Sequence, residues 1–262
     1  MRPKTIISRD NQLFKLARSL GTRKGREKKG MFLVEGSKLV NEVLSQPELV
    51  EAVLISEVFH ESCLENVLAA KIPVVSISNE LAKALAETET SQGIWAICRQ
   101  PDWDKAEYAE PLDLVLILAA IQDPGNLGTI LRTAWAVGVQ LVYLSPGSVD
   151  PFNPKVIRSA AGAHLNLPVI TGAGLDKILA LKKAGFSVWA CDPQGETDLY
   201  RSDLKGRLAL IMGNEGQGLS PEWRAVADGL LKIPLQPQVD SLNVAVACAV
   251  VLYEVYRQRQ HG

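Results

Sequence analysis

The sequence has few histidines and cysteines, and none of them stands in a metal-binding or redox motif. The three histidines and four cysteines are dispersed over 262 residues, without a CxxC or HExxH pattern. This argues against zinc fingers, zinc proteases and disulfide frameworks, so we expect no metal site and buried, reduced thiols. The GxSxG turn of α/β-hydrolases and the phosphate loop of P-loop enzymes are also missing, which weakens both of those interpretations.

Long apolar runs are absent as well. The longest, residues 114–121 and 244–253, are well short of the roughly 20 residues that span a bilayer. Residues 1–19 carry scattered charges and lack the apolar core of a secretion signal. We therefore expect a cytoplasmic protein that does not insert into a membrane.

Charge is unevenly distributed, although the formal net charge is only -1. Residues 1–30 carry ten basic and two acidic side chains, whereas the remainder of the chain is acidic. Such a basic arm favours a phosphate backbone as partner, because neutralised phosphates release counterions; a solvated tail is the alternative. The densest basic cluster, for which we expect phosphate contacts, is Arg23, Lys24, Arg26, Lys28 and Lys29.

Short apolar runs alternate with amphipathic stretches from residue 31 onward, which predicts an α/β protein. Residues 31–100 are predicted as a small α/β domain, residues 101–111 as a polar linker and residues 112–262 as a second domain. Its predicted strands are apolar almost throughout, which is typical of a mostly parallel sheet covered on both faces. The last helix is apolar on all sides over residues 244–252, so we expect it to lie in a core or against a second subunit.

The first of three unusual loops has the sequence DPGNLG, at residues 123–128. It follows a predicted strand of the second domain, at the end where parallel sheets bind ligands. Asn126 is the expected N-cap of the helix that begins here, and this helix carries Arg132. A capped turn with a solvent-facing arginine is the simpler alternative.

Two further loops follow other predicted strands of this domain. Residues 212–220 contain three glycines and Glu215. Their GxxGxG spacing departs from that of dinucleotide-binding loops, so a nicotinamide-dependent enzyme is the less favoured alternative. Residues 233–243 bring Ser241 and Asn243 to the start of the last helix, where either one can act as its cap.

Together and in this order, the three loops resemble the signature motifs of the SpoU-type RNA 2′-O-ribose methyltransferases, which belong to the SPOUT superfamily. The matching stretches are DPGNLGTILRTAWAVG, LALIMGNEGQGLS and KIPLQPQVDSLNVAVACAVVLYE. NPKVIRSAAGAHLNLPV is also similar to the family, and GMFLVEGSKLVNEVLS looks like its substrate-binding domain, which is related to small ribosomal proteins. The resemblance covers about residues 10–258.

Membership of this family would imply transfer of a methyl group from S-adenosylmethionine to a ribose 2′-hydroxyl in structured RNA. It would also imply a C-terminal α/β domain with a trefoil knot, which sequence patterns alone would not suggest because knots are rare, and a homodimer formed through that domain. Ribosomal RNA is the favoured substrate. Transfer RNA, or a catalytically silent RNA-binding protein of the same fold, is the alternative.

The resemblance also implies roles for individual residues. The catalytic group would be Asn126, Arg132, Glu215, Ser241 and Asn243. The cofactor pocket would include Gly213, Ile233 and Leu242. Because an arginine side chain stays protonated at neutral pH, we expect Arg132 to clamp a phosphate and stabilise developing alkoxide charge instead of removing the proton.

Overall fold

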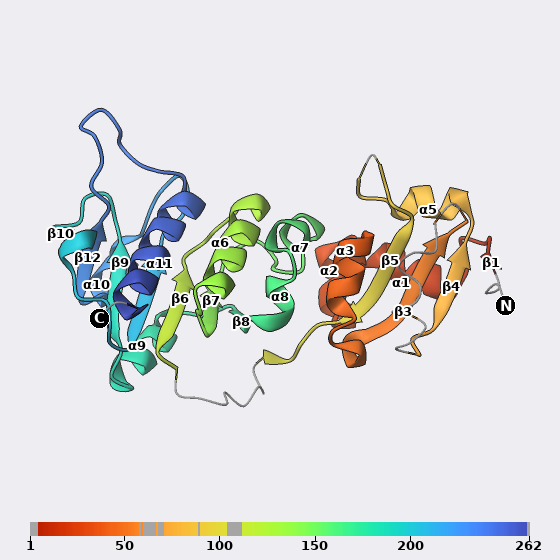
Figure 1. The fold of residues 1–262 in the computed structure, drawn as a ribbon, viewed down its shortest axis with the longest axis horizontal. Coiled ribbons are helices and arrows are strands. Elements are labelled where there is room, and N and C mark those ends of the chain that lie inside the picture. The colour runs from red at the N-terminus through yellow and green to blue at the C-terminus, as the bar shows by residue number, and fades with distance from the viewer. Residues whose placement is uncertain are drawn as a thin grey trace. The chain divides into compact units, whose positions relative to one another are not determined.

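The structure is a computed structural model, and it divides into two compact units. It describes residues 5–57, 59, 67, 71–88, 90–103 and 112–260. The first unit comprises Met1–Pro101 and Phe152–Leu165, and the second comprises Asp102–Pro151 and Asn166–Gly262. Figure 1 shows the elements of both as a ribbon. None of the helices in the described part of the chain combines the length and hydropathy needed to cross a bilayer.

The first unit is built on a five-stranded mixed sheet with the order β1-β4-β3-β5-β2. Strand β5 is antiparallel to both of its neighbours, and the remaining pairs are parallel. The strands are β1 (Thr5–Ile6), β2 (Met31–Glu35), β3 (Val50–Ser56), β4 (Val74–Ile77) and β5 (Ile94–Arg99). The described helices are α1 (Gln12–Ser19), α2 (Arg23–Lys29), α3 (Ser37–Val43), η1 (Pro47–Leu49), α5 (Asn79–Leu85), α7 (Pro154–Ala160) and α8 (Ala163–Asn166).

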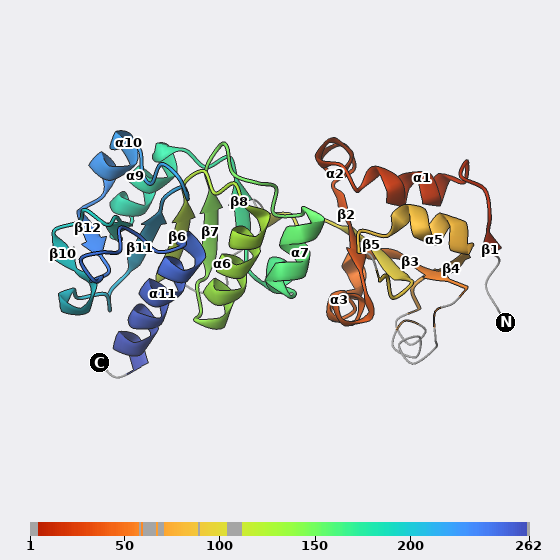
Figure 2. The ribbon, with the colours of Figure 1, turned by 90° about the horizontal axis from the view of Figure 1, so that it is seen from above.

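Helices cover both faces of this sheet. Phe14 of α1 and Leu81 of α5 pack with Trp95 on one face, where Figure 2 shows the two helices side by side. Val40 of α3 packs with Phe32 on the other face. The alternation of side chains along each strand supplies apolar groups to both layers.

Residues 12–29 differ from the expected basic arm, because they form the helices α1 and α2. Phe14, Ala17 and Leu20 are fully buried in the core of the first unit. The charges of this segment had suggested an arm, but its apolar residues supply one face of a domain. The substrate-binding domain expected at residues 31–100 therefore begins further towards the N-terminus.

The segment Phe152–Leu165 also departs from the expected domain boundaries, because it belongs to the first unit. Phe152, Ile157 and Leu165 join the same apolar core as Phe32. The side-chain amide of Gln46 donates a hydrogen bond to the carbonyl of Leu165 at 2.9 Å. The second unit is thus not continuous over residues 112–262 as the sequence had suggested.

The second unit contains a seven-stranded sheet with the order β10-β12-β9-β11-β6-β7-β8, in which all the described pairs are parallel. The strands are β6 (Leu114–Leu118), β7 (Leu141–Leu144), β8 (Val169–Thr171), β9 (Ser187–Cys191), β10 (Thr197–Asp198), β11 (Leu208–Met212) and β12 (Gly229–Lys232). The helices are α6 (Pro124–Ala136), α9 (Leu175–Lys183), η4 (Leu199–Arg201), α10 (Pro221–Val226) and α11 (Val244–Gln260). The expected parallel sheet is confirmed, and the expected knot stays a prediction.

Helices cover both faces of this sheet too. Figure 2 shows α9 and α10 on one side and α6 and α11 on the other. Ile178 and Leu181 of α9 pack with Trp223 of α10 over the first side, and α6 and α11 contact each other on the second. Strands β6 and β11 are entirely buried between these layers.

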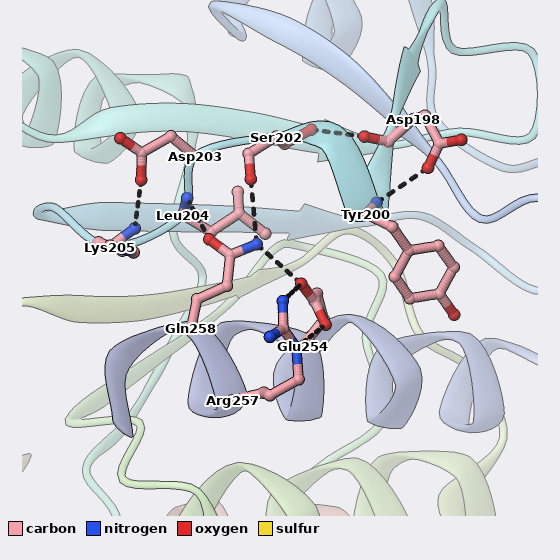
Figure 3. Close-up of polar contacts among 9 residues, drawn as sticks. All are labelled: Asp198, Tyr200, Ser202, Asp203, Leu204, Lys205, Glu254, Arg257 and Gln258. Atoms are coloured by element: carbon pink, nitrogen blue, oxygen red, sulfur yellow. Dashed lines mark hydrogen bonds and ion pairs between the residues drawn. The ribbon is translucent and has the colours of Figure 1, made fainter. Parts of the chain in front are cut away.

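The last helix, α11, is anchored near its end by a polar network (Figure 3). The side chain of Gln258 accepts from Leu204 N at 2.9 Å and donates to Ser202 O at 3.0 Å and to Glu254 at 2.8 Å. Arg257 donates two bonds to Glu254, at 2.7 and 2.8 Å, and lowers the pKa of this carboxyl. These contacts tie α11 to the chain that follows β10, which fixes the position of the helix on the sheet.

Candidate active site

The three loops singled out from the sequence follow strands that are close together in the second sheet. Strand β11 lies between β6 and β9, and β12 lies on the other side of β9. Because all four strands are parallel, the loops that follow them leave the same edge of the sheet. This arrangement brings together residues that are far apart in the sequence.

The loop after β6 starts helix α6 one turn earlier than expected. Asp123 is the N-cap, since its carboxylate accepts from Asn126 N at 2.8 Å, and Pro124 occupies the first helical position. The expectation that Asn126 caps the helix is therefore wrong. As the third residue of α6, Asn126 has a side-chain amide that can bond to the other loops.

Glu215 connects the second loop to the first. Its carboxylate accepts from the Asn126 side-chain amide at 3.1 Å and from the backbone N–H groups of Gln122 and Asp123 at 3.4 and 3.3 Å. Backbone N–H groups at a helix start have no partner within the helix and favour a negative charge. Glu215 thus fixes the second loop against the start of α6.

Asn214 and Gly213 shape the second loop itself. The Asn214 side chain donates to Ala120 O at 2.7 Å and accepts from Gly216 N at 2.9 Å. A Cβ atom on Gly213 would lie only 2.6 Å from the carbonyl carbon of Gly218, so any other residue at this position would displace the loop. Asn214 was not predicted as a site residue from the sequence, although it stands inside the second motif.

Asn243 connects the third loop to the first. Its side-chain amide donates to Asn126 Oδ1 at 3.0 Å. Its own Oδ1 accepts from Ala245 N and Val246 N at 2.9 and 3.3 Å, so Asn243 also caps α11. A continuous hydrogen-bonded chain, Asn243–Asn126–Glu215, thus joins all three loops.

A cleft of about 610 Å³ is bordered by the second and third loops and includes Glu215 in its wall. This volume lies in the usual range for small-molecule and cofactor sites. The cleft is also lined by four further expected site residues of these loops, namely Gly213, Ile233, Ser241 and Leu242. Ser241 is exposed, and nothing in the described part of the chain forms a hydrogen bond with its hydroxyl.

Arg132 stands apart from the Asn243–Asn126–Glu215 chain. It lies on α6 about two turns beyond Asn126 and is exposed. Within the described residues its guanidinium has no hydrogen bond or ion pair, and it is not among those that line the cleft. The structure thus brings three of the expected catalytic residues into contact and leaves Arg132 available to a bound molecule.

Asp192 and Arg224 are two of the charged residues of the cleft that were not singled out from the sequence. Asp192 follows β9 directly, and its carboxylate lies 2.9 Å from Arg224 Nε and accepts from Gln194 N at 2.8 Å. An acidic residue placed immediately after an apolar strand was the available signal. Cys191, the neighbouring cleft residue, stays a thiol because burial raises its pKa to about 12.

In the first unit, the structure divides the expected basic cluster. Arg26 is only 2% exposed, and its guanidinium donates to Leu20 O at 2.8 Å. Leu20 is the C-cap of α1, so Arg26 satisfies a carbonyl at a helix end and does not belong to the surface cluster. The exposed members are Arg23, Lys24, Lys28 and Lys29.

Family models match both units of the chain. Residues 113–253 match the SpoU rRNA Methylase family. The chain belongs to the SpoU rRNA methylase family. Residues 11–96 match the MRM3-like substrate binding domain. The resemblance drawn from the three loops is therefore confirmed, and with it the expected class of enzyme, an RNA methyltransferase.

Individual SpoU relatives resemble the chain over nearly its whole length. The 23S rRNA (guanosine(2553)-2′-O)-methyltransferase RlmP of Bacillus subtilis is 38% identical over 96% of this chain and 99% of its own. The crystal structure of an RNA 2′-O ribose methyltransferase superposes with a TM-score of 0.83 at 30% identity, over 98% of this chain and 100% of that chain. The SpoU methyltransferase AviRb from Streptomyces viridochromogenes, in complex with AdoMet, superposes with a TM-score of 0.84 at 26% identity, over 96% of this chain and 100% of that chain.

Proposed function

We propose that this SpoU-family enzyme uses S-adenosylmethionine to methylate a ribose 2′-hydroxyl in ribosomal RNA. The observation that carries the proposal is the Asn243–Asn126–Glu215 chain at the edge of a cofactor-sized cleft. Ribosomal RNA is favoured because the Bacillus subtilis relative, which acts on 23S rRNA, matches both units of the chain. Such a substrate also fits the cytoplasmic location expected from the sequence.

The residues of the cleft fit the cofactor. Ile233 and Leu242 supply apolar walls of the kind that an adenine ring requires. At Gly213 the backbone of the second loop folds too tightly for a Cβ, which keeps backbone groups open to a ligand. When bound, S-adenosylmethionine supplies an electrophilic methyl group.

The protein's own residues then position the ribose. The hydrogen-bonded residues Asn243, Asn126 and Glu215 hold the three loops in one arrangement, which would align a ribose hydroxyl with the methyl group of the cofactor. Arg132 contacts a phosphate of the RNA and stabilises negative charge that develops on the 2′-oxygen. Ser241, at the border of the cleft, supplies a further hydrogen bond to the bound molecules.

The exposed basic residues of α2 hold the RNA. Lys24, Lys28 and Lys29 are exposed on one short helix together with Arg23. Side chains of this kind contact phosphates and set the position of an RNA without reading its sequence. In this proposal the first unit supplies affinity and the second supplies the reaction.

A homodimer forms through the second unit. Helix α11 is not buried on all sides in the single chain, because Val246, Tyr253 and Tyr256 are exposed, and so is Trp135 of the neighbouring helix α6. An apolar surface of this kind is typical of a protein interface. Light scattering should give twice the 28.5 kDa mass of one chain, and Tyr253→Glu should reduce that mass towards one copy.

Methyl transfer to RNA tests the proposed reaction. Labelled S-adenosylmethionine is incubated with the enzyme and total RNA from a strain that lacks the gene, and alkali-resistant 2′-O-methyl positions are mapped. Label at one nucleotide of a ribosomal RNA, abolished by Arg132→Ala, is the expected result. Label confined to transfer RNA would overturn the substrate, and tight cofactor binding without transfer to either RNA or ribosomal particles would favour a catalytically silent protein.

A further inference from the structure

Strand order sets the order of ligand-binding groups along the edge of the second sheet. The sequence of neighbours is β12, β9, β11 and β6. Ile233 follows β12, Asp192 follows β9, Glu215 follows β11, and Asn126 follows β6. Any ligand that extends from Ile233 to the Asn126–Glu215 contact therefore passes the end of β9.

S-adenosylmethionine has its parts in a matching order. Its ribose links the adenine ring to the sulfonium that carries the methyl group. With the adenine against Ile233 and the methyl group delivered beside Glu215, the ribose would lie in between, near Asp192. A backbone hydrogen bond fixes the position of Asp192 at this edge, since Asp192 N donates to Leu231 O of β12 at 2.9 Å.

Asp192 and Arg224 form a preorganised pair at this place. The Asp192 side chain is 2% exposed, and its contacts with Arg224 Nε and Gln194 N leave further lone pairs on a carboxylate that can accept about four hydrogen bonds. The Arg224 side chain is 38% exposed and also lines the cleft. None of the hydrogen bonds in the described part of the structure involves its two terminal nitrogens, which remain available to a ligand.

We propose that the Asp192–Arg224 pair binds the ribose hydroxyls of the cofactor. A vicinal diol both donates and accepts, so one hydroxyl donates to the carboxylate while the other accepts from the guanidinium. The pair has no net charge, which suits a neutral diol better than the sulfonium or the ammonium of the cofactor. Stability alone explains such a pair poorly, because desolvation of the buried Asp192 carboxylate offsets much of its attraction to Arg224. The inference rests on the proposed cofactor.

Two ligands that differ only in the ribose hydroxyls test the inference. Calorimetric titration of the full chain compares S-adenosylhomocysteine with its 2′,3′-dideoxy analogue. The wild-type protein should bind the analogue at least tenfold more weakly. Asp192→Asn should raise the Kd for S-adenosylhomocysteine by about tenfold. In this variant the Kd values of the two ligands should differ by less than about threefold. Equal binding of both ligands by the wild type, or equal weakening of both in the variant, would overturn the proposal.

A third ligand and a second variant exclude the alternatives. 5′-Methylthioadenosine keeps the ribose but lacks the amino-acid part, so Asp192→Asn should raise its Kd by the same factor. An unchanged Kd for this ligand would mean that the pair binds the amino-acid part of the cofactor, which would overturn the proposal. Asp228→Asn removes the ion pair with Lys182 at the other end of β9, where Asp228 also accepts from Val188 N. This control should keep the wild-type Kd, and an equal loss would show a general effect of disturbing β9.

The titration of the wild-type protein distinguishes failure of the proposed ribose site from failure of the proposed cofactor. Binding of S-adenosylhomocysteine without discrimination against the dideoxy analogue would contradict the ribose site alone. No binding of S-adenosylhomocysteine would contradict the assigned cofactor, and the ribose site with it. Both results come from the unmodified chain, so they do not depend on how well a variant folds.

Discussion

The two units arrange their candidate functional residues in opposite ways. In the second unit, Asn126 and Asn243 are 117 positions apart and yet share a hydrogen bond. In the first unit, Arg26 is only two positions away from Lys24 and Lys28 in the sequence and yet is buried, whereas they are exposed. Loops that follow parallel strands converge on one edge of a sheet, whereas one side of a helix has to face the protein. Proximity in the sequence is therefore the weaker guide to a shared site.

Removal of Arg132 should have the largest effect on activity. Arg132→Ala is expected to reduce single-turnover methyl transfer by about 100-fold or more, because it removes a charged donor that acts on the transition state. The Kd for S-adenosylhomocysteine should stay within about twofold, since Arg132 is not among the described residues that line the cleft. Arg132→Lys keeps the charge without the planar fork and should recover only part of the rate. Loss of cofactor binding with a normal rate per bound cofactor would contradict this role.

Disruption of the Asn243–Asn126–Glu215 chain should have the next largest effect. Asn126→Ala and Asn243→Ala are each expected to slow methyl transfer by about 10- to 100-fold, the range for a hydrogen bond in a charged network. Because both residues belong to the same hydrogen-bonded network, the double variant should be little slower than the slower single variant. Independent, additive losses would show that the two residues act separately.

The capping role of Asn243 needs a control of its own. Its Oδ1 caps α11, so Asn243→Ala also removes about 0.5–2 kcal/mol of helix stabilisation. Asn243→Ser keeps a good cap and lacks the amide that donates to Asn126. A serine variant with normal thermal stability and reduced methyl transfer would assign the loss to the contact between loops. Full activity in that variant would assign it to the helix cap.

The basic helix α2 provides the corresponding test in the first unit. Replacing the exposed Lys28 and Lys29 with alanine should weaken RNA binding by about tenfold at low salt and flatten its salt dependence, because fewer counterions are released. The thermal stability should not change. Arg26→Ala should behave in the opposite way, lowering the free energy of unfolding by about 1–3 kcal/mol, because Leu20 O at the end of α1 loses its donor. If both variants weakened RNA binding and left stability intact, the division of the basic cluster would be wrong.

The sequence predicted the second unit better than the first. Its continuously apolar strands indicated a parallel sheet, and the three motifs indicated which loops meet at its edge. The position of Phe152–Leu165 could not be predicted, because the apolar character of Phe152 and Ile157 does not reveal which core they join. The helix start was predictable in retrospect, since Pro124 prefers the first helical position and places the cap at Asp123.

The missed pair in the cleft shows a different limit. Asp192 has a local signal, since it directly follows an apolar strand. Its partner Arg224 lies on the short helix α10, and nothing near it in the sequence connects it to β9. Only the arrangement of β9 and α10 in the second unit brings the two charges together. Pairs of this kind have to be found in the structure.

The smallest predicted effect tests whether Phe152–Leu165 belongs to the core of the first unit. His164 is buried edge-on against Phe32 and Phe152, with ring centroids 5.5 and 6.2 Å away, and neither ring nitrogen has a hydrogen-bond partner among the described residues. Burial lowers the pKa of His164 to about 4, whereas an unfolded histidine titrates near about 6.5. Between these values the unfolded chain binds a proton that the native protein does not. Burial of the neutral His164 therefore does not lower the free energy of unfolding above about pH 6.5. As the pH falls from there towards 4, it lowers the free energy of unfolding by up to about 1.4 kcal/mol per pH unit.

Urea unfolding at pH 7 and pH 5 measures this dependence, followed by the fluorescence of Trp95 in a background in which the other four tryptophans are replaced by phenylalanine. Other groups titrate in this range, so the difference between the wild type and His164→Leu is the quantity to compare. The wild type should lose more stability than the variant on acidification, because leucine fills the site between Phe32 and Phe152 without binding a proton. An identical loss in both proteins would mean that His164 is solvated, and the segment would then not be packed in the core of the first unit.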